Sequence, residues 1–466
     1  MAPSPSQRQE TNAVASLISG ENETEIYELD KSGHVQQHWI HEPSGRIVQI
    51  RPAGRANDIF SRSVREWRRI LSDSFLPVGF PHSVSPDYLA YQTFDSLQAF
   101  FSTITSLLAN RALLEGLGVG DASSSATFAL LLTVMKDAMS RVATIVFAHR
   151  FGLRIEPDAK RYRFLADLFN DTAFFMELYS PYLTSWGKMA ALGTGEALRA
   201  LCGVSAGASK AALSVHFAKH DNLAELNAKE ASQETAVGLV GLLAGTMVVK
   251  VIEDHTSVVY LMILLVFAHL WMNYLGVRSV QMTTLNRQRA SILFQEYLRS
   301  GIVLSPAEVA KREYIILWSP NVTNRQGERV AKIELAHSFG HAMSNGRREV
   351  KLIDGDKYTI FVASSAGAVV PMRILLWEGS TPKQALKAWF AAMEMAWLMD
   401  RETGMRATLN RIFSSKENVV SGYLKQFNSD QLWEAMVDKG WDLGTQSLET
   451  GAPVRLSVRE REKKIY

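Results

Sequence analysis

The chain has little cysteine and no excess of charge of one sign. Its 466 residues include a single cysteine, Cys202, which excludes an intramolecular disulfide framework and a cysteine-rich zinc module. The 50 basic residues are balanced by 47 acidic ones, so the net charge of +3 gives no reason to expect nucleic acid as a partner. Hydrophobic residues at 47% and charged residues at 21% exclude a disordered or collagen-like chain.

Common catalytic and targeting motifs are also missing. The sequence has no GxxxxGK[ST] phosphate loop and no HExxH zinc motif, and its N-terminus lacks the basic and apolar regions of a secretory signal peptide. The glycines Gly116, Gly118 and Gly120 follow an expected helix rather than a strand, so they indicate a helix end. These absences favour a non-enzymatic protein, and we assign no catalytic residue and no cofactor.

Apolar residues are concentrated in Ala236–Val277, where three of 42 residues are charged. Those three are Lys250, Glu253 and Asp254. The segment Ser257–Val277 has 21 residues without Asp, Glu, Lys or Arg, and about 20 apolar residues span a bilayer, so we expect a transmembrane helix there. The 15 residues of Thr235–Val249 suit a tilted hairpin arm, a re-entrant segment or a buried helix better than an independent span.

Basic residues follow this span and indicate its orientation. They are Arg278, Arg287 and Arg289. By the positive-inside tendency they place the C-terminal side of the span in the cytoplasm. We therefore expect a membrane protein that has the lipid bilayer as partner and a cytoplasmic C-terminal domain, while the sequence does not indicate the organelle.

Small residues recur at four-residue spacing and favour close helix packing. They are Gly241 and Gly245 in one segment, and Gly203, Gly207 and Ala211 in another. In a membrane such faces allow a homo-oligomer or a complex with a second member of the same family. In a soluble protein the same spacing indicates tight internal packing.

The N-terminal region changes sign of charge over a short distance. Residues 1–45 contain seven acidic residues, whereas residues 46–69 contain seven arginines. The arginine-rich segment is either a basic arm attracted to anionic lipid or a solvated segment.

Several polar groups have helical spacing. Arg163, Asp167 and Asp171 lie on one face, either as a salt bridge or as paired carboxylates for a cation. Asp137 and Arg141 are four residues apart and are either a functional pair inside a bilayer or a structural ion pair. A further polar group comes directly before the apolar stretch. It consists of Lys229, Glu230, Gln233 and Glu234. Glutamates near the N-terminus of a helix interact favourably with the helix dipole, which is a structural explanation for this group.

Two histidine pairs have the i, i+4 spacing that zinc ligands use on a helix. They are His216/His220 and His337/His341. The pairs lie in different expected domains and no carboxylate completes a standard ligand spacing, so we assign no metal site.

These features predict a predominantly α-helical, membrane-associated region followed by a smaller mixed α/β C-terminal domain. Residues 1–59 form an N-terminal extension that we expect to be partly disordered, 60–304 the helical domain with membrane segments near 235–277, and 305–466 the α/β domain. In the last, we expect strands at 314–318, 349–353, 357–362 and 372–376. Helices are expected after Ser305-Pro306, from Thr381-Pro382 through Leu398, and near 407–427 and 430–439.

Four segments resemble, in this order, sequences of the root UV-B sensitive family. They are FLPVGFPHSVSPDYLAYQTFDSLQAF (Phe75–Phe100), RFLADLFNDTAF (Arg163–Phe174), GVSAGASKAALSVHFA (Gly203–Ala218) and AKEASQETAVGLVG (Ala228–Gly241). EGSTPKQALKAWFAA (Glu378–Ala392) is similar to the C-terminal helix of the family. The resemblance implies membrane association and a link to vitamin B6 homeostasis, auxin transport and root development under ultraviolet-B light, without an established catalytic activity. The acidic N-terminus argues against a plastid transit peptide, which is poor in acidic residues.

The resemblance extends to most of the polar positions and makes them candidate ligand-binding residues. With Arg141, the candidates are Asp137, Asp167, Asn170, Asp171, Arg199, Lys210, His216, Lys229, Glu230, Gln233 and Glu234. Three hypotheses follow, in order of preference. The first is a non-enzymatic membrane scaffold or helper in small-molecule homeostasis or trafficking. The second is a carrier or ligand-binding protein, with a vitamin B6 vitamer such as pyridoxal phosphate as ligand and Lys210 able to form a Schiff base. The last is a metal-dependent enzyme that uses Asp167 and Asp171.

Overall fold

The computed structural model describes residues 23–29, 35–44, 46–50, 67, 70–116, 126–252, 254–346, 350–363, 369–399 and 429–459. The chain divides into two compact units, which we describe separately. The first comprises residues 1–88 and 217–236, and the second comprises residues 89–216 and 237–466.

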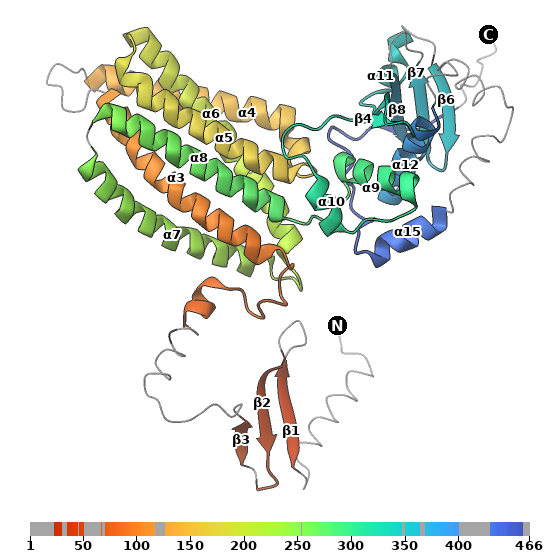
Figure 1. The fold of residues 1–466 in the computed structure, drawn as a ribbon, viewed down its shortest axis with the longest axis horizontal. Coiled ribbons are helices and arrows are strands. Elements are labelled where there is room, and N and C mark those ends of the chain that lie inside the picture. The colour runs from red at the N-terminus through yellow and green to blue at the C-terminus, as the bar shows by residue number, and fades with distance from the viewer. Residues whose placement is uncertain are drawn as a thin grey trace, which may run out of the picture. The chain divides into compact units, whose positions relative to one another are not determined.

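Long helices form one half of the second unit (Figure 1). They are α3 (Tyr88–Gly116), α4 (Ala126–Ile155), α5 (Ala159–Tyr179), α6 (Ser185–Phe217), the second half of α7 (Leu223–Val251) and α8 (His255–Ser279). Helix α3 is described as far as Gly116, and Gly118 and Gly120 of the expected helix end lie outside the described residues. Helix α8 begins where the carboxylate of Asp254 accepts a hydrogen bond from the backbone N–H of Ser257, 2.9 Å away.

The helices α7 and α8 are each long and apolar enough to cross a membrane. Helix α8 confirms the helix expected over Ser257–Val277. The residues Thr235–Val249 form the second half of α7, a helix of 29 residues that begins at Leu223. Of the three interpretations of this segment, the buried helix is wrong, because only 11% of the most apolar window of α7 is buried. Lys250 and Asp254 lie where the two helices meet, so the charges at the middle of the apolar stretch belong to the turn of a helical hairpin.

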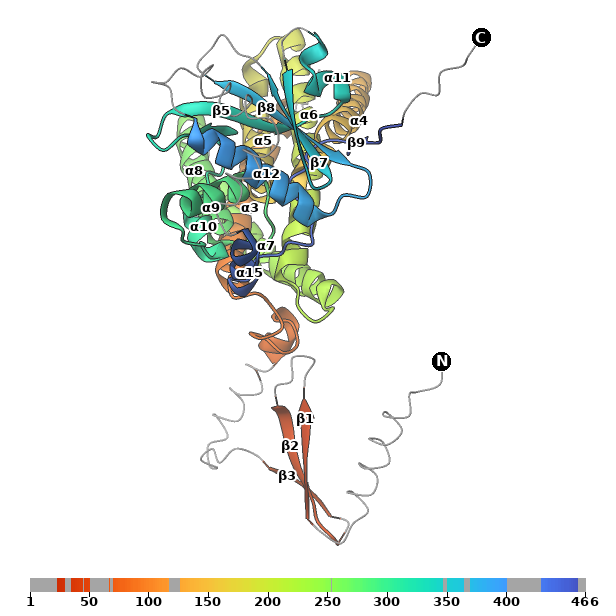
Figure 2. The same cartoon turned by 90° about the vertical axis from the view of Figure 1, so that its right-hand side faces the viewer.

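The C-terminal part of the second unit is a mixed sheet covered by helices (Figure 2). The strands, in the order β4-β5-β8-β7-β6 with β9 beside β8, are β4 (Asn321–Thr323), β5 (Arg329–Leu335), β8 (Val370–Trp377), β7 (Tyr358–Ala363), β6 (Val350–Gly355) and β9 (Arg455–Leu456). The helices are α9 (Arg287–Ser300), α10 (Pro306–Arg312), α11 (Phe339–Ala342), α12 (Pro382–Leu398) and α15 (Ser429–Asp438). Helix α12 packs on the sheet and buries Trp389 completely in the largest core cluster. A helical region followed by a mixed α/β region is therefore the fold class, as expected.

Most of the expected C-terminal elements are confirmed. The hairpin β6–β7 pairs Gly355 with Tyr358 across its turn, and β8, α10, α12 and α15 lie where the sequence places them. The strand expected at 314–318 is wrong, since these residues form no ladder and Leu317 is 86% exposed. The helix expected near 407–427 lies outside the described residues.

The first unit contains a three-stranded antiparallel sheet within the N-terminal extension. Its strands are β1 (Thr24–Leu29), β2 (Val35–His41) and β3 (Ile47–Ile50). No strand was predicted in this part of the chain, so the sheet is an addition to the expected fold. Most of the arginine-rich segment 46–69 lies outside the described residues.

Candidate functional site

A network of polar side chains is buried between α3, α5 and α8. At its centre the Arg163 guanidinium donates to Asp95 on α3 at 2.7 Å and to Asp167 on its own helix at 3.2 Å. The hydroxyl of Tyr91 accepts a third hydrogen bond from Arg163 at 3.3 Å. Arg163, Asp95 and Asp167 are all more than nine-tenths buried. Because isolated charges are costly in such a place, their mutual pairing is what makes the burial possible.

The network continues along α8. The Asp167 carboxylate accepts hydrogen bonds from the amides of Gln98 on α3 and Asn273 on α8. His269 on α8 places Nδ1 2.8 Å from an oxygen of Asp171, and its Nε2 lies 3.7 Å from Asp167. The four-residue steps from Asp167 to Asp171 and from His269 to Asn273 bring these side chains to facing positions on the two helices. The arrangement can hold a proton between His269 and Asp171, next to a fixed arginine.

The twelve candidate residues are not gathered in one pocket. Asp167 and Asp171 belong to the buried network, whereas Asp137 and Arg141 are exposed on α4. In the described part of the chain no ion pair joins Asp137 to Arg141. The neighbouring Lys136 lies 3.5 Å from Glu196 on α6 instead. The helices therefore do not bring all twelve positions into one shared pocket.

The other candidates on α5 and α6 have local surroundings. Asn170 is half-buried beside the network. Arg199 forms an ion pair with Glu177 and lies 4.9 Å from the centre of the Phe174 ring, which ties α6 to α5. Lys210 and His216 are half-buried on the last turns of α6.

The polar group at the start of α7 binds the end of a short helical stretch of the first unit, residues 70–75, and the turn that follows it. Lys229 and Gln233 donate to the backbone carbonyls of Asp73 and Phe75, and Glu225 accepts from the N–H of Val78 at 2.7 Å. Glu230 is 1% exposed and Glu234 is half-buried on the same helix. These contacts give Lys229 and Gln233 a role in fixing the segment before α3.

Reasoning from the sequence missed five members of the network. They are Tyr91, Asp95, Gln98, His269 and Asn273. The signal was present, because His269 and Asn273 are polar and four residues apart within an otherwise apolar helix.

The spacing GxSxG also occurs, at Gly203–Gly207, but it lies inside α6 rather than on the strand-to-helix turn of a nucleophile elbow.

The two histidine pairs have different geometries. His220 follows the end of α6 at Phe217 with a positive φ of 58°, so it does not share a helical face with His216. The rings of His337 and His341 stack with their centres 3.9 Å apart. Among the described residues no group of three or more His, Cys, Asp or Glu side chains is placed to hold a metal ion.

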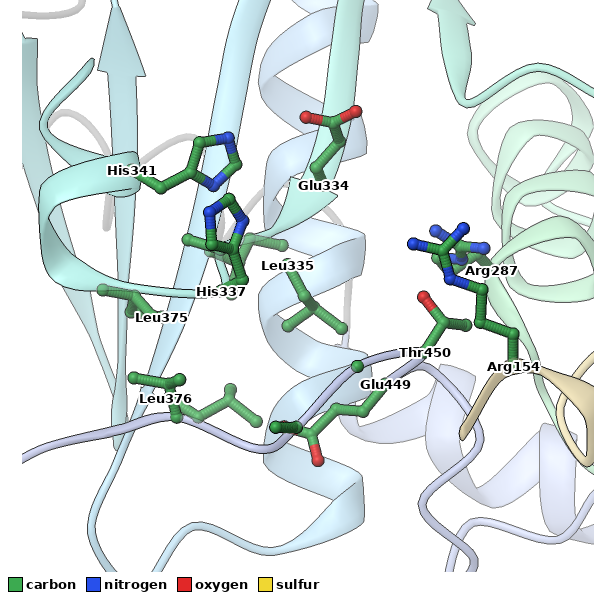
Figure 3. Close-up of a pocket in the computed structure, with 15 residues that line it drawn as sticks. Arg154, Arg287, Glu334, Leu335, His337, His341, Leu375, Leu376, Glu449 and Thr450 are labelled. Atoms are coloured by element: carbon green, nitrogen blue, oxygen red, sulfur yellow. The ribbon is translucent and has the colours of Figure 1, made fainter. Parts of the chain in front are cut away.

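A polar pocket of about 310 Å³ lies in the second unit between the helix ends and the sheet (Figure 3). Arg154 at the end of α4 and Arg287 at the start of α9 line one side, and Glu334, His337 and His341 line another. Leucines of β8 and the segment Glu449–Val454 complete the wall. Burial lowers the pKa of His341, and the nearby charge of Arg373 and the ring of His337 lower it further, so at neutral pH this imidazole is uncharged.

A buried ion cluster joins the bundle to the C-terminal helices. Glu313, after α10, pairs with Lys160 on α5 and with Arg289 on α9, the latter at 3.0 Å. Burial alone would raise the pKa of Glu313, but the charges of Lys160 and Arg289 outweigh it and hold the pKa below its usual range. The cluster fixes α9 and α10 against the end of α5.

Comparison with known proteins identifies the family. The family model described as "Vitamin B6 photo-protection and homoeostasis domain" matches residues 61–301. The chain is 37% identical over 287 residues to "RUS family member 1" of Dictyostelium discoideum, covering 61% of this chain and 54% of that protein. It is 32% identical to "Protein root UVB sensitive 3" of Arabidopsis thaliana, over 72% of this chain and 77% of that protein. "Protein root UVB sensitive 2, chloroplastic" of Arabidopsis thaliana is 29% identical, over 64% of this chain and 67% of that protein.

The chain thus spans about half the length of the Dictyostelium relative and about three quarters of the Arabidopsis root UVB sensitive 3 protein. No solved structure matches. The matched domain covers more than half of the chain and carries the buried network of α3, α5 and α8. The chain belongs to the root UVB sensitive family.

Proposed function

We propose that the chain is a non-enzymatic integral membrane protein that serves small-molecule homeostasis, with the helices α7 and α8 anchoring its bundle in the bilayer. The observation that carries this proposal is the exposure of α7. In its most apolar 18-residue window, 11% of the residues are buried inside the protein, and in α8 the share is 33%. The core helix of a soluble protein is mostly buried, as α12 is, so an apolar and exposed helix hairpin favours lipid as its surroundings.

The exposed side chains are large and aliphatic or aromatic. On α7 and α8 they include Leu239, Val240, Leu243, Met247, Tyr260, Ile263, Leu264 and Phe267. At about 1.5 Å per residue, a helix of this length exceeds the hydrocarbon thickness of about 30 Å, so the hairpin crosses and returns. Arg278 and the C-terminal domain then lie on the cytoplasmic side, in line with the positive-inside tendency.

The buried network supports a role beyond anchoring. Ionisable groups at membrane depth are costly and mark functional positions by default, and here they pair across three helices of the bundle. The name of the matched domain connects this role to vitamin B6. A carrier or ligand-binding function is the second candidate, and the pocket beside Arg154 and Arg287 favours it.

Self-association is part of the same proposal. Gly241 and Gly245 are used inside the protein, since a Cβ at Gly241 would lie 3.0 Å from Thr103 Cβ on α3. Gly203 and Gly207 have no heavy atom within 4 Å of such a position, which leaves the small-residue face of α6 open to a second copy or another family member. Chemical crosslinking of the wild type and of Gly207→Leu tests self-association through α6. The variant should give less dimer than the wild type, and equal dimer yields would contradict the proposal.

Alkaline extraction of membranes tests the anchoring directly. The full-length chain should remain in the membrane pellet with a known integral protein, while a peripheral marker is released. Recovery of the chain in the soluble fraction would overturn the integral-membrane proposal. A protease added to the cytoplasmic face should remove the C-terminal domain, and its complete protection would contradict the orientation.

A further inference from the structure

The pocket between the end of the bundle and the sheet is lined by two arginines, Arg154 and Arg287. Arg154 has no ion pair with any described residue. Arg287 forms an ion pair with Asp158 at 3.6 Å and lies 5.8 Å from the centre of the Trp318 ring, but its buried Nε has no hydrogen-bond partner in the described part of the chain. Two guanidinium groups therefore face one cavity with donors to spare.

The carboxylates on the opposite wall are already engaged. Glu334 pairs with Lys332, and Glu449 accepts two hydrogen bonds from Arg455, at 2.5 and 3.2 Å. They do not neutralise Arg154 and Arg287, whose side chains lie on the same side of the pocket in Figure 3. The charge left over in the cavity is positive, so an anion fits it.

The rest of the lining indicates the body of the ligand. Ile374, Leu375 and Leu376 of β8 provide an apolar wall, and the stacked rings of His337 and His341 provide a flat one. The buried Nδ1 of His341 has no hydrogen-bond partner among the described residues. A volume of about 310 Å³ is within the range of small-molecule sites.

We propose that this pocket binds a phosphomonoester, whose phosphate is held by Arg154 and Arg287 and whose body lies against the flat and apolar walls. The guanidinium group of an arginine can donate two parallel hydrogen bonds to two oxygens of one phosphate. Such charge-assisted hydrogen bonds are stronger than hydrogen bonds between neutral groups. The phosphate belongs either to a soluble metabolite or to a lipid headgroup at the membrane surface. This inference rests on the second candidate function, ligand binding. It does not require the membrane anchor, and since binding is measured in detergent, a failure of the anchoring proposal would not affect the result.

The site also joins two parts of the chain. Arg154 and Arg287 lie within the matched family domain, whereas His337, His341 and Glu449 lie beyond it. A ligand here would therefore bind both the helical region and the C-terminal sheet.

Calorimetric titration of the full-length protein in detergent tests the proposal with four probes. Pyridoxine 5′-phosphate has no aldehyde and so forms no Schiff base with surface lysines, and pyridoxine is its match without phosphate. Inorganic phosphate tests the anion alone, and dihexanoyl phosphatidic acid below its micelle concentration tests the lipid source. We expect pyridoxine 5′-phosphate or the short lipid to bind at least about tenfold more tightly than pyridoxine.

Two variants and one control complete the test. Arg154 is exposed, so Arg154→Gln leaves folding intact and should weaken phosphate-dependent binding at least about tenfold, as should Arg287→Gln. Arg150→Gln, one turn earlier on α4 and outside the pocket, should bind as the wild type does. Preference for the soluble probe over the lipid identifies a metabolite site, and the reverse identifies a headgroup site. The proposal is overturned if no phosphate probe binds, if pyridoxine binds equally well, or if Arg150→Gln loses as much as Arg154→Gln.

Discussion

Arg163 joins carboxylates of two helices, Asp95 on α3 and Asp167 on α5. The same guanidinium reaches Tyr91, so one side chain satisfies three partners in the interior of the bundle. Buried ion pairs add little net stability when complete, but they are costly to break, because the remaining partner keeps its charge without compensation.

Replacement of Arg163 by Met should therefore destabilise the protein by about 3–5 kcal/mol, since Asp95 and Asp167 stay buried without their cation. Arg161→Met, two residues away and exposed, is the matched control. Thermal unfolding of both variants in detergent measures the difference. If Arg163→Met unfolds at the same temperature as Arg161→Met, the network does not hold the three helices together.

Glu394 on α12 is a second residue with a testable environment. It is 1% exposed, and neither carboxyl oxygen has a hydrogen-bond partner in the described part of the chain. Burial raises the pKa of Glu394 to about 7. A raised pKa in the folded state means that stability is greatest at low pH and is lost as the pH rises through about 7.

The wild type should consequently lose about 2 kcal/mol of stability between pH 5 and pH 8 that Glu394→Gln does not lose, because glutamine carries no charge at either pH. Tryptophan fluorescence follows the unfolding, since Trp389 and Trp397 lie on the same helix. Glu378→Gln, at an exposed position, should keep the pH dependence of the wild type. A flat wild-type profile over this range would contradict the assignment.

At the scale of elements, the two glycine-containing faces of the bundle differ. A Cβ at Gly241 would lie 3.2 Å from the carbonyl oxygen of Phe100, whereas at Gly207 the space is open. Helix α7 therefore packs Gly241 against α3, whereas a Cβ at Gly203 or Gly207 of α6 would meet no heavy atom within 4 Å among the described residues.

Gly241→Val should push α7 away from α3 and cost about 1–3 kcal/mol, while Gly207→Val should cost less than half as much in the protomer. Both variants change glycine to the same side chain within a helix, so the backbone effects cancel in the comparison. Midpoints of unfolding in detergent give the two values. Equal losses would show that close packing at Gly241 does not stabilise the hairpin.

The elements that local chemistry specifies were predictable from the sequence. Ser305-Pro306 and Thr381-Pro382 form capping boxes with Glu308 and Gln384, and both helices begin there. The turn of the hairpin β6–β7 lies between the paired residues Gly355 and Tyr358, so the residues that specify it are neighbours in the sequence. In contrast β5 pairs in parallel with β8 some 40 residues later, and no local signal announces such a partner.

The candidate site shows the same limit. Arg163, Asp167 and Asp171 share one helix, and their grouping followed from spacing alone. Asp95 and His269 join them from helices about 70 and 100 residues away in the chain, which only tertiary packing reveals. Asp137 and Arg141 had favourable spacing as well, yet their face of α4 points outward.

The proposed membrane anchor of the chain requires lipid around α7 and α8. Leu243→Arg places a charge on the exposed apolar face, where it costs about 2.5–3.5 kcal/mol at mid-bilayer. The membrane-integrated fraction should fall accordingly. Leu317→Arg, at an exposed leucine of the C-terminal region, should leave it unchanged. Equal integration of both variants would contradict a lipid-facing α7.

Labelling of single cysteines shows whether the hairpin of α7 and α8 is surrounded by lipid or by water. In a Cys202→Ser background, cysteines are introduced at Lys250, beside the hairpin turn, and at Leu243 and Leu264 on the apolar faces. In membrane fragments open on both sides, a water-soluble maleimide should modify position 250 rapidly, and positions 243 and 264 only after detergent is added. Equal and rapid labelling at all three positions without detergent would show that the hairpin is in water.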